Sequence, residues 1–515
     1  MKEPAGGTLI VDNTRRLNAA TLSTLPASIA KPTYDRTRLT PGTLHLGSGA
    51  FHRAHLMDFT EDALHADFGP WGVIGVNLRP PDLGVILEPQ DGLYCRQLRA
   101  KSAEDSRIVG ALLGGFTVLD AGYDPHHLGL ARALDLASRA TIRVISMTVT
   151  EKGYCHIPAT GHLNPDHPDI VHDVANPRHP RSVPGFALEV IRRRFAASVS
   201  QPVFMSCDNV PGNGTTLKTC VLELAGLSRP ELVAPIEDQV VFLNTMVDRI
   251  APATRPEDIA AFRGATGVAD FALAVGEPFR MWAIEKDDRA RLPAWDAVGA
   301  MIVDNVADYE TIKMRVVNGM QTGTCHLGHM AGYAFMADVF ADPLFSRFAR
   351  RTVEREVAPN LPKVAGIDLP AYIAETVKRL ENPALRHGTA QISTDGSRKV
   401  RQRLLEPLYD ARRAGLAADG LTLAVAGWIA HLIALSGADR DPAIADPILE
   451  TARSLWAETG KDPAAFVDAI LSLHEVFPER IASIDGLGAT LVANVIALRT
   501  KPVREVLAGH LADPG

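Results

Sequence analysis

The sequence predicts an α/β protein in which a domain built on a mostly parallel sheet is followed by an all-helical domain. In the first half, short runs rich in β-branched residues alternate with helical stretches, as they do where helices cover the faces of a parallel sheet. From about residue 304 onward, Ala/Leu-rich helical segments follow one another and runs with strand character almost vanish. With 515 residues the chain is also too long for one ordinary core.

The individual elements follow from these two patterns. Strands are expected at 43–47, 71–78, 141–150 and 202–208. Helices are expected between 47 and 71 and over 184–199. The second half predicts helices over 304–337, 343–357, 369–382, 400–415, 421–436, 446–458, 463–475 and 488–508. We therefore expect two domains, 1–295 and 296–515.

Composition narrows the class of partner. The net charge of −7 and the lack of a long basic run argue against nucleic acid and favour a small-molecule partner. The five cysteines stand singly, which suits a reducing compartment, and no secretory signal is visible, so we expect a cytoplasmic protein. Residues 421–438 are uncharged and reach the short limit for a membrane span, but a buried helix explains them equally well. No membrane partner is expected.

The run LHLGSGAFHRAH predicts a strand, a turn at Gly47-Ser48-Gly49 and a helix. Two glycines let the backbone approach a pyrophosphate, whose charge then lies at the free N–H groups of the helix. The third glycine of the usual dinucleotide pattern is replaced by His52. A plain tight turn between strand and helix therefore stays open as the alternative.

A dinucleotide site also needs a group for the adenosine ribose after the second strand. Strand 71–78 is followed by RPPD, which offers Asp82. A carboxylate there accepts the ribose hydroxyls and repels a 2′-phosphate, which favours NAD over NADP; Arg79 argues the other way. On its own, Asp82 is equally explained as a solvated residue of a Pro-Pro-Asp turn.

The run KMRVVNGMQ places a lysine and two carboxamides in a stretch with the apolar pattern of a core helix. At 100° per residue, Asn318 lies about 140° and Gln321 about 80° from Lys313, so the three share one broad face, with Glu310 at about 60°. Desolvation disfavours the ammonium form of such a lysine, which can then accept a proton from an alcohol. Carboxamide groups beside it would stabilise an alkoxide or polarise a carbonyl. A surface face with a snorkelling lysine is the alternative.

At this point several segments together resemble one family, the long-chain, polyol-specific dehydrogenases that comprise mannitol 2-dehydrogenases and fructuronate reductases (D-mannonate oxidoreductases). The segments that carry the resemblance are GSGAFHRAH, SMTVTEKGY, SCDNVPGNG, FLNTMVDRIAP and KMRVVNGMQ. The resemblance implies a Rossmann-type NAD-binding domain and a helical domain that carries the substrate and catalytic residues. It implies zinc-independent hydride transfer between an open-chain polyol or sugar acid and its 2-keto form. The family includes monomers, so we expect a monomer or a weak homo-oligomer.

The family's functional residues can be carried over where the motifs match. Lys313 matches the general base, Asn209 and Asn318 match the asparagines that hold the reacting oxygen, Glu310 matches a proton relay, and Asp82 matches the ribose ligand. The resemblance places the cofactor against Gly47, Gly49, Ala50, Phe51 and His52 and the substrate against Asp248, Arg249, Gln391 and Lys399.

One position departs from the family pattern. The family has a histidine that binds substrate where this chain has Gln321, which can still form hydrogen bonds but cannot titrate. On a continuous helix His326 points about 220° away from Lys313, and His329 lies about 24 Å further along the axis, so neither can take that place. Because the lysine is the base, we expect the chemistry to survive, with an altered choice of substrate.

The stretch GTAQISTDGSRKVRQR, 388–403, bears on the substrate. Its Q-I and Q-R dipeptides are more similar to fructuronate reductases than to mannitol dehydrogenases, which tend to have arginine at the position of Gln391. Basic side chains after the turn would also suit a sugar carboxylate, although a solvated face explains them as well: Arg398, Lys399, Arg401 and Arg403. We therefore lean towards D-mannonate/D-fructuronate, with D-mannitol/D-fructose as the alternative.

Other classes of protein explain the sequence less completely than an oxidoreductase does. A catalytically silent NAD-binding protein would explain Gln321 but not the joint retention of Lys313, Asn318 and Asn209. A helical interaction scaffold would leave the glycine turn without a use. The histidines and the cysteine in 155–180 make a metal site conceivable, but their spacing is irregular, and we expect a solvent-exposed connection and no metal.

Overall fold

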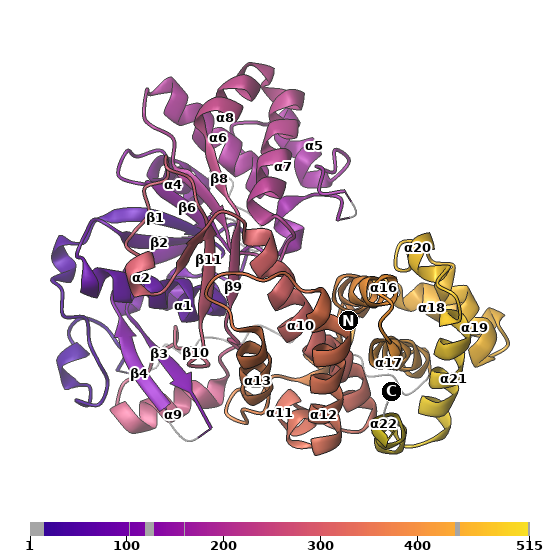
Figure 1. Ribbon diagram of the computed structural model, residues 1–515. Coiled ribbons are helices and arrows are strands. Elements are labelled where there is room, and N and C mark those ends of the chain that lie inside the picture. Colours follow the sequence, from indigo (N-terminus) through magenta and orange to yellow (C-terminus); the bar gives the residue numbers. More distant parts are fainter. Residues whose placement is uncertain (1–14, 102–103, 119–127, 159, 438–442, 513–515) are drawn as a thin grey trace. The chain divides into compact units, whose positions relative to one another are not determined.

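The computed structural model describes residues 15–101, 104–118, 128–158, 160–437 and 443–512 (Figure 1). The chain divides into two compact units, Met1–Ala307 (unit 1) and Asp308–Gly515 (unit 2). Unit 1 contains parallel sheet and helices, and the described part of unit 2 is helical, so the predicted fold class is confirmed.

A parallel sheet of six strands forms the centre of unit 1. In spatial order its strands are β5 (Leu112–Thr117), β2 (Gly72–Asn77), β1 (Pro41–Leu46), β6 (Val144–Met147), β7 (Val203–Ser206) and β8 (Val241–Leu243). Counted along the chain this is the order 3-2-1-4-5-6 of the doubly wound dinucleotide-binding fold. The chain leaves β1 towards β2 on one side and later returns to β6 on the other. The switch point at the end of β1 is where such sheets bind ligands.

The helices of unit 1 cover both faces of this sheet. They are α1 (Ala50–Ala54), α2 (Leu56–Ala66), α3 (Gly84–Leu87), α4 (Leu128–Ala137), α5 (Pro168–Ala175), α6 (Val183–Ala196), α7 (Asn213–Ser228), α8 (Val233–Gln239) and α9 (Pro256–Thr266). Residues of α4, α6 and α7 share one buried cluster with Ile145 of β6. Its neighbour Val144 packs on the opposite face with Phe59 of α2 and Trp282. This alternation follows from the two-residue period of a strand.

Two smaller sheets complete unit 1, and the sequence predicted neither. One has the order β10-β3-β4, with β3 (Tyr94–Arg99) antiparallel to β4 (Glu104–Val109) and parallel to β10 (Ala274–Gly276). The other has the order β12-β11-β9. Its strands are β9 (Thr245–Asp248), β11 (Met281–Glu285) and β12 (Met301–Val303). Many of these strands have only three to five residues, too few for a periodic pattern to be read from sequence.

Unit 2 contains a long helix, α10, and a buried helix, α17. Its helices are α10 (Val306–Met330), α11 (Met336–Ala341), α12 (Pro343–Thr352), α13 (Leu369–Leu380), α14 (Thr389–Ser393), α15 (Gly396–Val400), α16 (Glu406–Arg413), α17 (Asp419–Leu435), α18 (Leu449–Glu458), α19 (Pro463–Leu471), α20 (Glu479–Ala482), α21 (Leu487–Thr500) and α22 (Val503–Ala512). Single π-helical turns follow α12 over Val353–Val357 and α15 over Arg401–Leu405. Such turns occur often at functional sites.

Two predicted helices are broken in the structure. The expected helix over 304–337 ends at Met330, because Gly332 adopts a left-handed conformation with φ of +87° and Tyr333 N–H donates to the carbonyl of Gly328. The expected helix over 488–508 is interrupted after Thr500, before Pro502, which cannot continue the backbone hydrogen bonds of α21.

Helix α17 fixes the position of α10 within unit 2. A side chain added at Gly427 of α17 would lie 2.7 Å from a methyl carbon of Leu327, so the two helices approach closely there. Further along the pair, His326 and His431 meet through their Nδ1 atoms at 2.9 Å. Nearly every residue of α17 is buried. Among the described residues, no helix is both long and apolar enough to cross a membrane.

Candidate active site

The glycine turn lies at the switch point of the sheet. Gly47 has φ of +84°, and a Cβ there would lie 2.2 Å from the carbonyl oxygen of Thr148, so only glycine fits. Gly49 differs: it is exposed, and a Cβ would meet only the Gly47 carbonyl oxygen, at 3.9 Å. The space beside Gly49 is therefore open. The first N–H groups of α1 have no partner within their helix, so the place suits an anionic group such as a pyrophosphate.

Neighbouring strands hold the turn in place. Gly47 N–H donates to the carbonyl of Val76 at 2.9 Å, and Ser48 N–H donates to Oδ1 of Asn77 at 2.9 Å, which ties the turn to the end of β2. The hydroxyl of Thr148, beyond β6, donates to the carbonyl of Gly47 at 2.8 Å. The ends of three strands thus meet at the turn.

His52, which the resemblance placed against the cofactor, lies beneath the turn. Its Nδ1 is 2.8 Å from the hydroxyl oxygen of Ser48, and its ring stacks on that of His45 at 3.6 Å. Burial holds the pKa of His52 well below its usual range, so the ring is neutral. These contacts support the turn from below, whereas Ala50 and Phe51 are half-buried at the start of α1.

The segment after β2 carries both residues considered for the ribose. Asp82 is exposed, and its Oδ1 accepts a hydrogen bond from Gly84 N–H at 3.0 Å. Arg79 forms an ion pair with Asp169 at the start of α5, which the sequence did not predict. Because the two residues lie 90 positions apart, no local pattern could have signalled the pair.

Asn209 follows β7 and is exposed. The residue before it, Asp208, joins the ends of β6 and β7, because its carboxylate accepts hydrogen bonds from Val149 N–H at 3.0 Å and Thr150 N–H at 2.8 Å. The phenol of Tyr154 donates to the same carboxylate at 2.9 Å. Burial raises the pKa of Asp208 to about 6. Sequence reasoning missed Asp208, although it stands within the SCDN motif.

Arg249 and Asp248 are buried at the end of β9. The Arg249 guanidinium donates to Oδ2 of Asp58 at 2.8 Å and to the carbonyl of Phe279 at 2.9 Å, so it links α2 to the segment that precedes β11. Three further arginines pair with Asp58: Arg96, Arg107 and Arg280. The guanidinium groups hold the pKa of this carboxyl below its usual range although burial opposes them. The signal in the sequence that could have indicated this cluster is Asp58, a charged residue within the apolar run LMDF.

In unit 2, α10 carries the lysine and the carboxamides. Lys313, Asn318 and Gln321 are only 6%, 8% and 7% exposed, and the helix is continuous through all three, so the surface-face interpretation is wrong. Glu310 is half-buried one turn before Lys313. The Oδ1 atom of Asn318 is buried, and no residue in the described part of the chain offers it a hydrogen bond. Other buried side-chain atoms of the described chain also lack a partner, but this one lies on the same helix as Lys313, where it can accept a hydrogen bond from a bound hydroxyl group.

The two later histidines of α10 turn towards α17. His326 meets His431 as described above, and the rings of His329 and His431 lie 5.0 Å apart. Burial holds the pKa of His326 well below its usual range, and His431 adds to the effect. The expectation that neither histidine replaces Gln321 agrees with their packing on α17.

The stretch 388–403 folds as α14, a turn, α15 and a π-helical turn. The Lys399 ammonium donates to the carbonyls of Ile392 at 2.8 Å and Thr394 at 2.5 Å, at the end of α14. Arg403 donates to the hydroxyl of Thr322 on α10 at 3.1 Å, which holds the stretch against the lysine helix. Gln391 and Arg398 are exposed.

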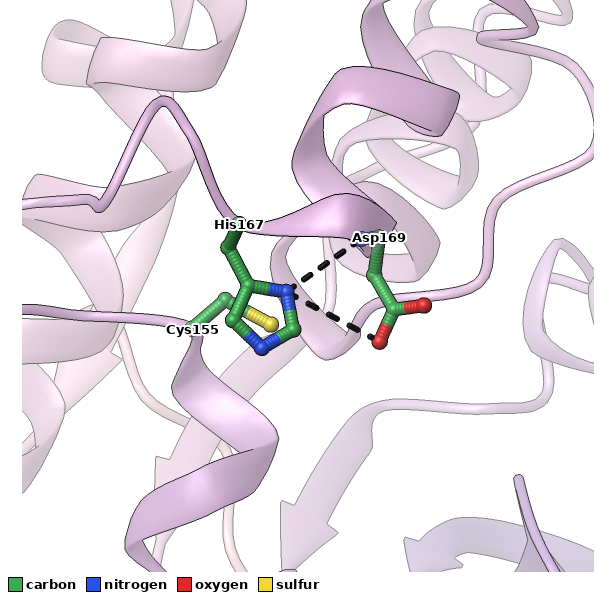
Figure 2. Close-up of side chains that lie close together, drawn as sticks. All are labelled: Cys155, His167 and Asp169. Carbon is green, nitrogen blue, oxygen red and sulfur yellow. Dashed lines mark hydrogen bonds and ion pairs between the residues drawn. The ribbon is translucent and has the colours of Figure 1, made fainter.

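The stretch 155–180 was expected to be a solvent-exposed connection, which is wrong in part, because it contains α5 and the buried Cys155. Cys155, His167 and Asp169 bring one possible metal ligand each to within 4.8 Å of one another (Figure 2). Two of these groups are already engaged: Nδ1 of His167 accepts from Asp169 N–H at 3.2 Å, and the Asp169 carboxylate pairs with Arg79. Burial raises the pKa of the Cys155 thiol to about 12. His167 and Asp169 therefore form a hydrogen-bonded ion-pair cluster with Arg79.

Comparison with known proteins identifies the family. The mannitol dehydrogenase Rossmann domain matches residues 41–297, and the mannitol dehydrogenase C-terminal domain matches residues 305–498. The chain belongs to the mannitol dehydrogenase family. The resemblance that the motifs indicated is thereby confirmed.

Several family members are similar along nearly the whole chain. D-mannonate oxidoreductase of Escherichia coli is 36% identical over 92% of this chain and 96% of its own length. Mannitol 2-dehydrogenase of Cereibacter sphaeroides is 33% identical over 94% of this chain and 99% of its own length. The structure of Pseudomonas fluorescens mannitol 2-dehydrogenase in a ternary complex with NAD and D-mannitol has a TM-score of 0.86 and 30% identity, and the match covers 97% of this chain and all of that one (100%).

Proposed function

We propose that the chain is an NAD-dependent secondary-alcohol dehydrogenase that interconverts an open-chain sugar acid with its 2-keto form. The observation that carries the proposal is the buried face of α10, where Lys313 shares a helix side with Asn318 and its unpartnered amide oxygen. A buried lysine on the same helix as a carboxamide that can still accept a hydrogen bond suits proton transfer at a substrate hydroxyl. NAD, when bound, supplies or accepts the hydride.

Each residue of the chain has a defined task in this proposal. Lys313 accepts the proton from the hydroxyl that is oxidised and returns it when the carbonyl is reduced. Asn209 and Asn318 orient the reacting oxygen and stabilise its developing charge. Glu310, half-buried one turn away, passes the proton between Lys313 and solvent. No metal is required, because the lysine supplies the acid–base chemistry.

The cofactor is placed at the glycine turn. The open space beside Gly49 and the first N–H groups of α1 accept the pyrophosphate, and Asp82 accepts the ribose hydroxyls. The ternary complex of the Pseudomonas fluorescens relative with NAD supports a cofactor of this type. We favour NAD over NADP because a carboxylate after β2 repels a 2′-phosphate.

The choice of substrate rests on the 388–403 stretch and on Gln321. We propose D-mannonate and D-fructuronate, because Gln391 differs from the arginine of mannitol dehydrogenases and the exposed Arg398 can meet a sugar carboxylate. The similarity to D-mannonate oxidoreductase of Escherichia coli supports this choice. The second candidate is D-mannitol and D-fructose, which the similarity to mannitol 2-dehydrogenases favours.

The test is the initial rate of NADH oxidation by the purified chain with D-fructuronate, D-tagaturonate, D-fructose and D-xylulose. We expect the highest kcat/KM with D-fructuronate, and a loss of about 100- to 10,000-fold in Lys313→Ala, since general acid–base catalysis contributes that much. Lys363→Ala is the matched control, because Lys363 is an exposed lysine of the same unit.

Each result separates the candidates. Preference for D-fructose would identify a mannitol 2-dehydrogenase. NADH binding without turnover of any of the four substrates would favour the silent NAD-binding protein. Activity that survives in Lys313→Ala would remove the lysine from its proposed role.

A further inference from the structure

Arg79 forms an ion pair with a carboxylate that lies 90 residues away in the chain. It lies two residues beyond the end of β2, and its guanidinium pairs with Asp169 in the first turn of α5. Both residues belong to unit 1. The arginine side chain is 61% exposed and the aspartate side chain only 17%, so the carboxylate is the more enclosed partner and the guanidinium the more accessible one.

The structure also explains why Asp169 stays in place. Its backbone N–H donates to Nδ1 of His167, the N-cap of α5, at 3.2 Å, which fixes the start of the helix (Figure 2). A carboxylate in the first turn of a helix is stabilised by the helix dipole. Asp169 is therefore anchored before any ligand arrives.

The position of Arg79 suggests a role for this ion pair in binding of the adenosine ribose. The hydrogen bond from Ser48 N–H to Asn77 ties the chain after β2 to the glycine turn. In a doubly wound sheet this chain faces the adenosine ribose, where NADP carries a 2′-phosphate and NAD a hydroxyl. A guanidinium is the side chain best suited to bind a phosphate there.

We infer that Asp169 determines cofactor specificity: by pairing with Arg79 it withholds the guanidinium from a 2′-phosphate, so that the chain prefers NAD. The inference rests on the proposed function, because it requires a dinucleotide at the glycine turn. Asp82 disfavours the phosphate by repulsion, and Asp169 acts separately by removing the group that would attract it.

The test measures cofactor binding to the full-length protein, without substrate, by titration with NADH and with NADPH and detection of nicotinamide fluorescence. The variants are Asp169→Asn, Arg79→Ala and the double variant. The matched control is Asp166→Asn, which removes a carboxylate from the same segment, at a residue that is exposed. Asparagine has the shape of aspartate, so the fold is preserved.

We expect Asp169→Asn to tighten NADPH binding about tenfold, the size of one charge-assisted hydrogen bond, and to change NADH binding less than about twofold. The double variant should lose the gain, because the gain acts through Arg79. Asp166→Asn and Arg79→Ala should each leave NADPH binding within about twofold of wild type.

Three results would overturn the inference. These are an unchanged affinity for NADPH in Asp169→Asn, a gain that persists in the double variant, and an equal gain in Asp166→Asn, which would indicate a general effect of charge. The proposed function is judged by turnover, so a protein that discriminates between NADH and NADPH through Arg79 and Asp169 but reduces no sugar would lose that proposal alone.

Discussion

Asp208 and Thr150 join the ends of two neighbouring strands: the N–H of Thr150 donates to Oδ1 of Asp208 at 2.8 Å. Thr150 has φ of +65°, an unfavourable conformation for a β-branched residue, so this bond helps to hold a strained segment. The next residue in the chain after Asp208 is Asn209, which we propose orients the reacting oxygen. The carboxylate thus positions Asn209.

We expect Asp208→Asn to lower kcat by on the order of 10- to 100-fold, because a displacement of about 1 Å at a reacting group costs this much. The amide offers one acceptor where the carboxylate serves two backbone N–H groups. The KM for NADH should change little. Steady-state rates test this, and unchanged kcat would show that Asp208 does not position Asn209.

The same carboxyl predicts a dependence of activity on pH. Burial raises the pKa of Asp208 to about 6, so below this pH the protonated carboxyl loses acceptor capacity. We expect kcat to fall as the pH falls through about 6 and this step to be absent in Asp208→Asn. A step of equal size in the variant would assign it to another group.

The two glycines of the turn should respond differently to the same substitution. Gly47→Ala should destabilise the protein, because a Cβ there would lie 2.2 Å from a carbonyl oxygen at φ of +84°. Gly49→Ala should leave the melting temperature unchanged and weaken NADH binding about tenfold, since the methyl group occupies the space for the phosphate. Thermal melting and NADH titration of both variants test the pair. Unchanged binding in Gly49→Ala would place the phosphate elsewhere.

Glu356 caps the buried helix α17, and its two carboxylate oxygens accept hydrogen bonds from Gly420 N–H and Leu421 N–H, both at 2.8 Å. Glu356→Ala leaves two buried donors unsatisfied, so the free energy of unfolding should fall by about 2 to 5 kcal/mol. Denaturation followed by circular dichroism measures this. The control Glu354→Ala removes an exposed residue paired with Arg350 and should cost less than about 1 kcal/mol.

Glu356 should also make stability depend on pH. Burial raises its pKa from 4.5 to about 7 in the folded state, so the folded protein holds this proton to a higher pH than the unfolded chain does. Its contribution to stability is full below pH 4.5 and is lost as the pH rises through about 7. Wild type should therefore lose stability relative to Glu356→Gln over this window. A constant difference would refute the shift.

Removal of metal should leave turnover intact. Lys313 supplies the acid–base chemistry in our proposal. In the cluster of Cys155, His167 and Asp169, the histidine accepts a hydrogen bond and the aspartate pairs with Arg79. We expect equal rates before and after dialysis against EDTA. If activity were lost and Zn²⁺ restored it, Cys155→Ser would show whether this cluster of three residues binds the metal.

The sequence was sufficient where a pattern is local. The strands at 43–47 and 71–78 and the face of Lys313 follow from periods of two and about 3.6 residues, and the structure contains them. The breaks near Gly332 and Pro502 also had local signals, but those were outweighed by the apolar periodicity around them.

What could not be predicted depends on partners distant in the chain. Asp58 pairs with arginines up to 222 residues away in the chain, and the pairing of β3 with β10 joins Arg96 to Ala274. Burial of these charges is stable only because all the partners meet. A pattern within one segment of the sequence carries no information about contacts with distant segments.

Helix α10 is continuous from Val306 to Met330. Its later half packs against α17, and its earlier half carries Lys313. The direction in which the Lys313 ammonium group points therefore depends on packing contacts such as that of Leu327 with Gly427, which take no part in the reaction. A substitution at Gln321 can change which substrate is bound without changing the direction of the lysine side chain. A side chain at Gly427 is less easily accommodated, because its Cβ would lie 2.7 Å from a methyl carbon of Leu327, which would have to shift.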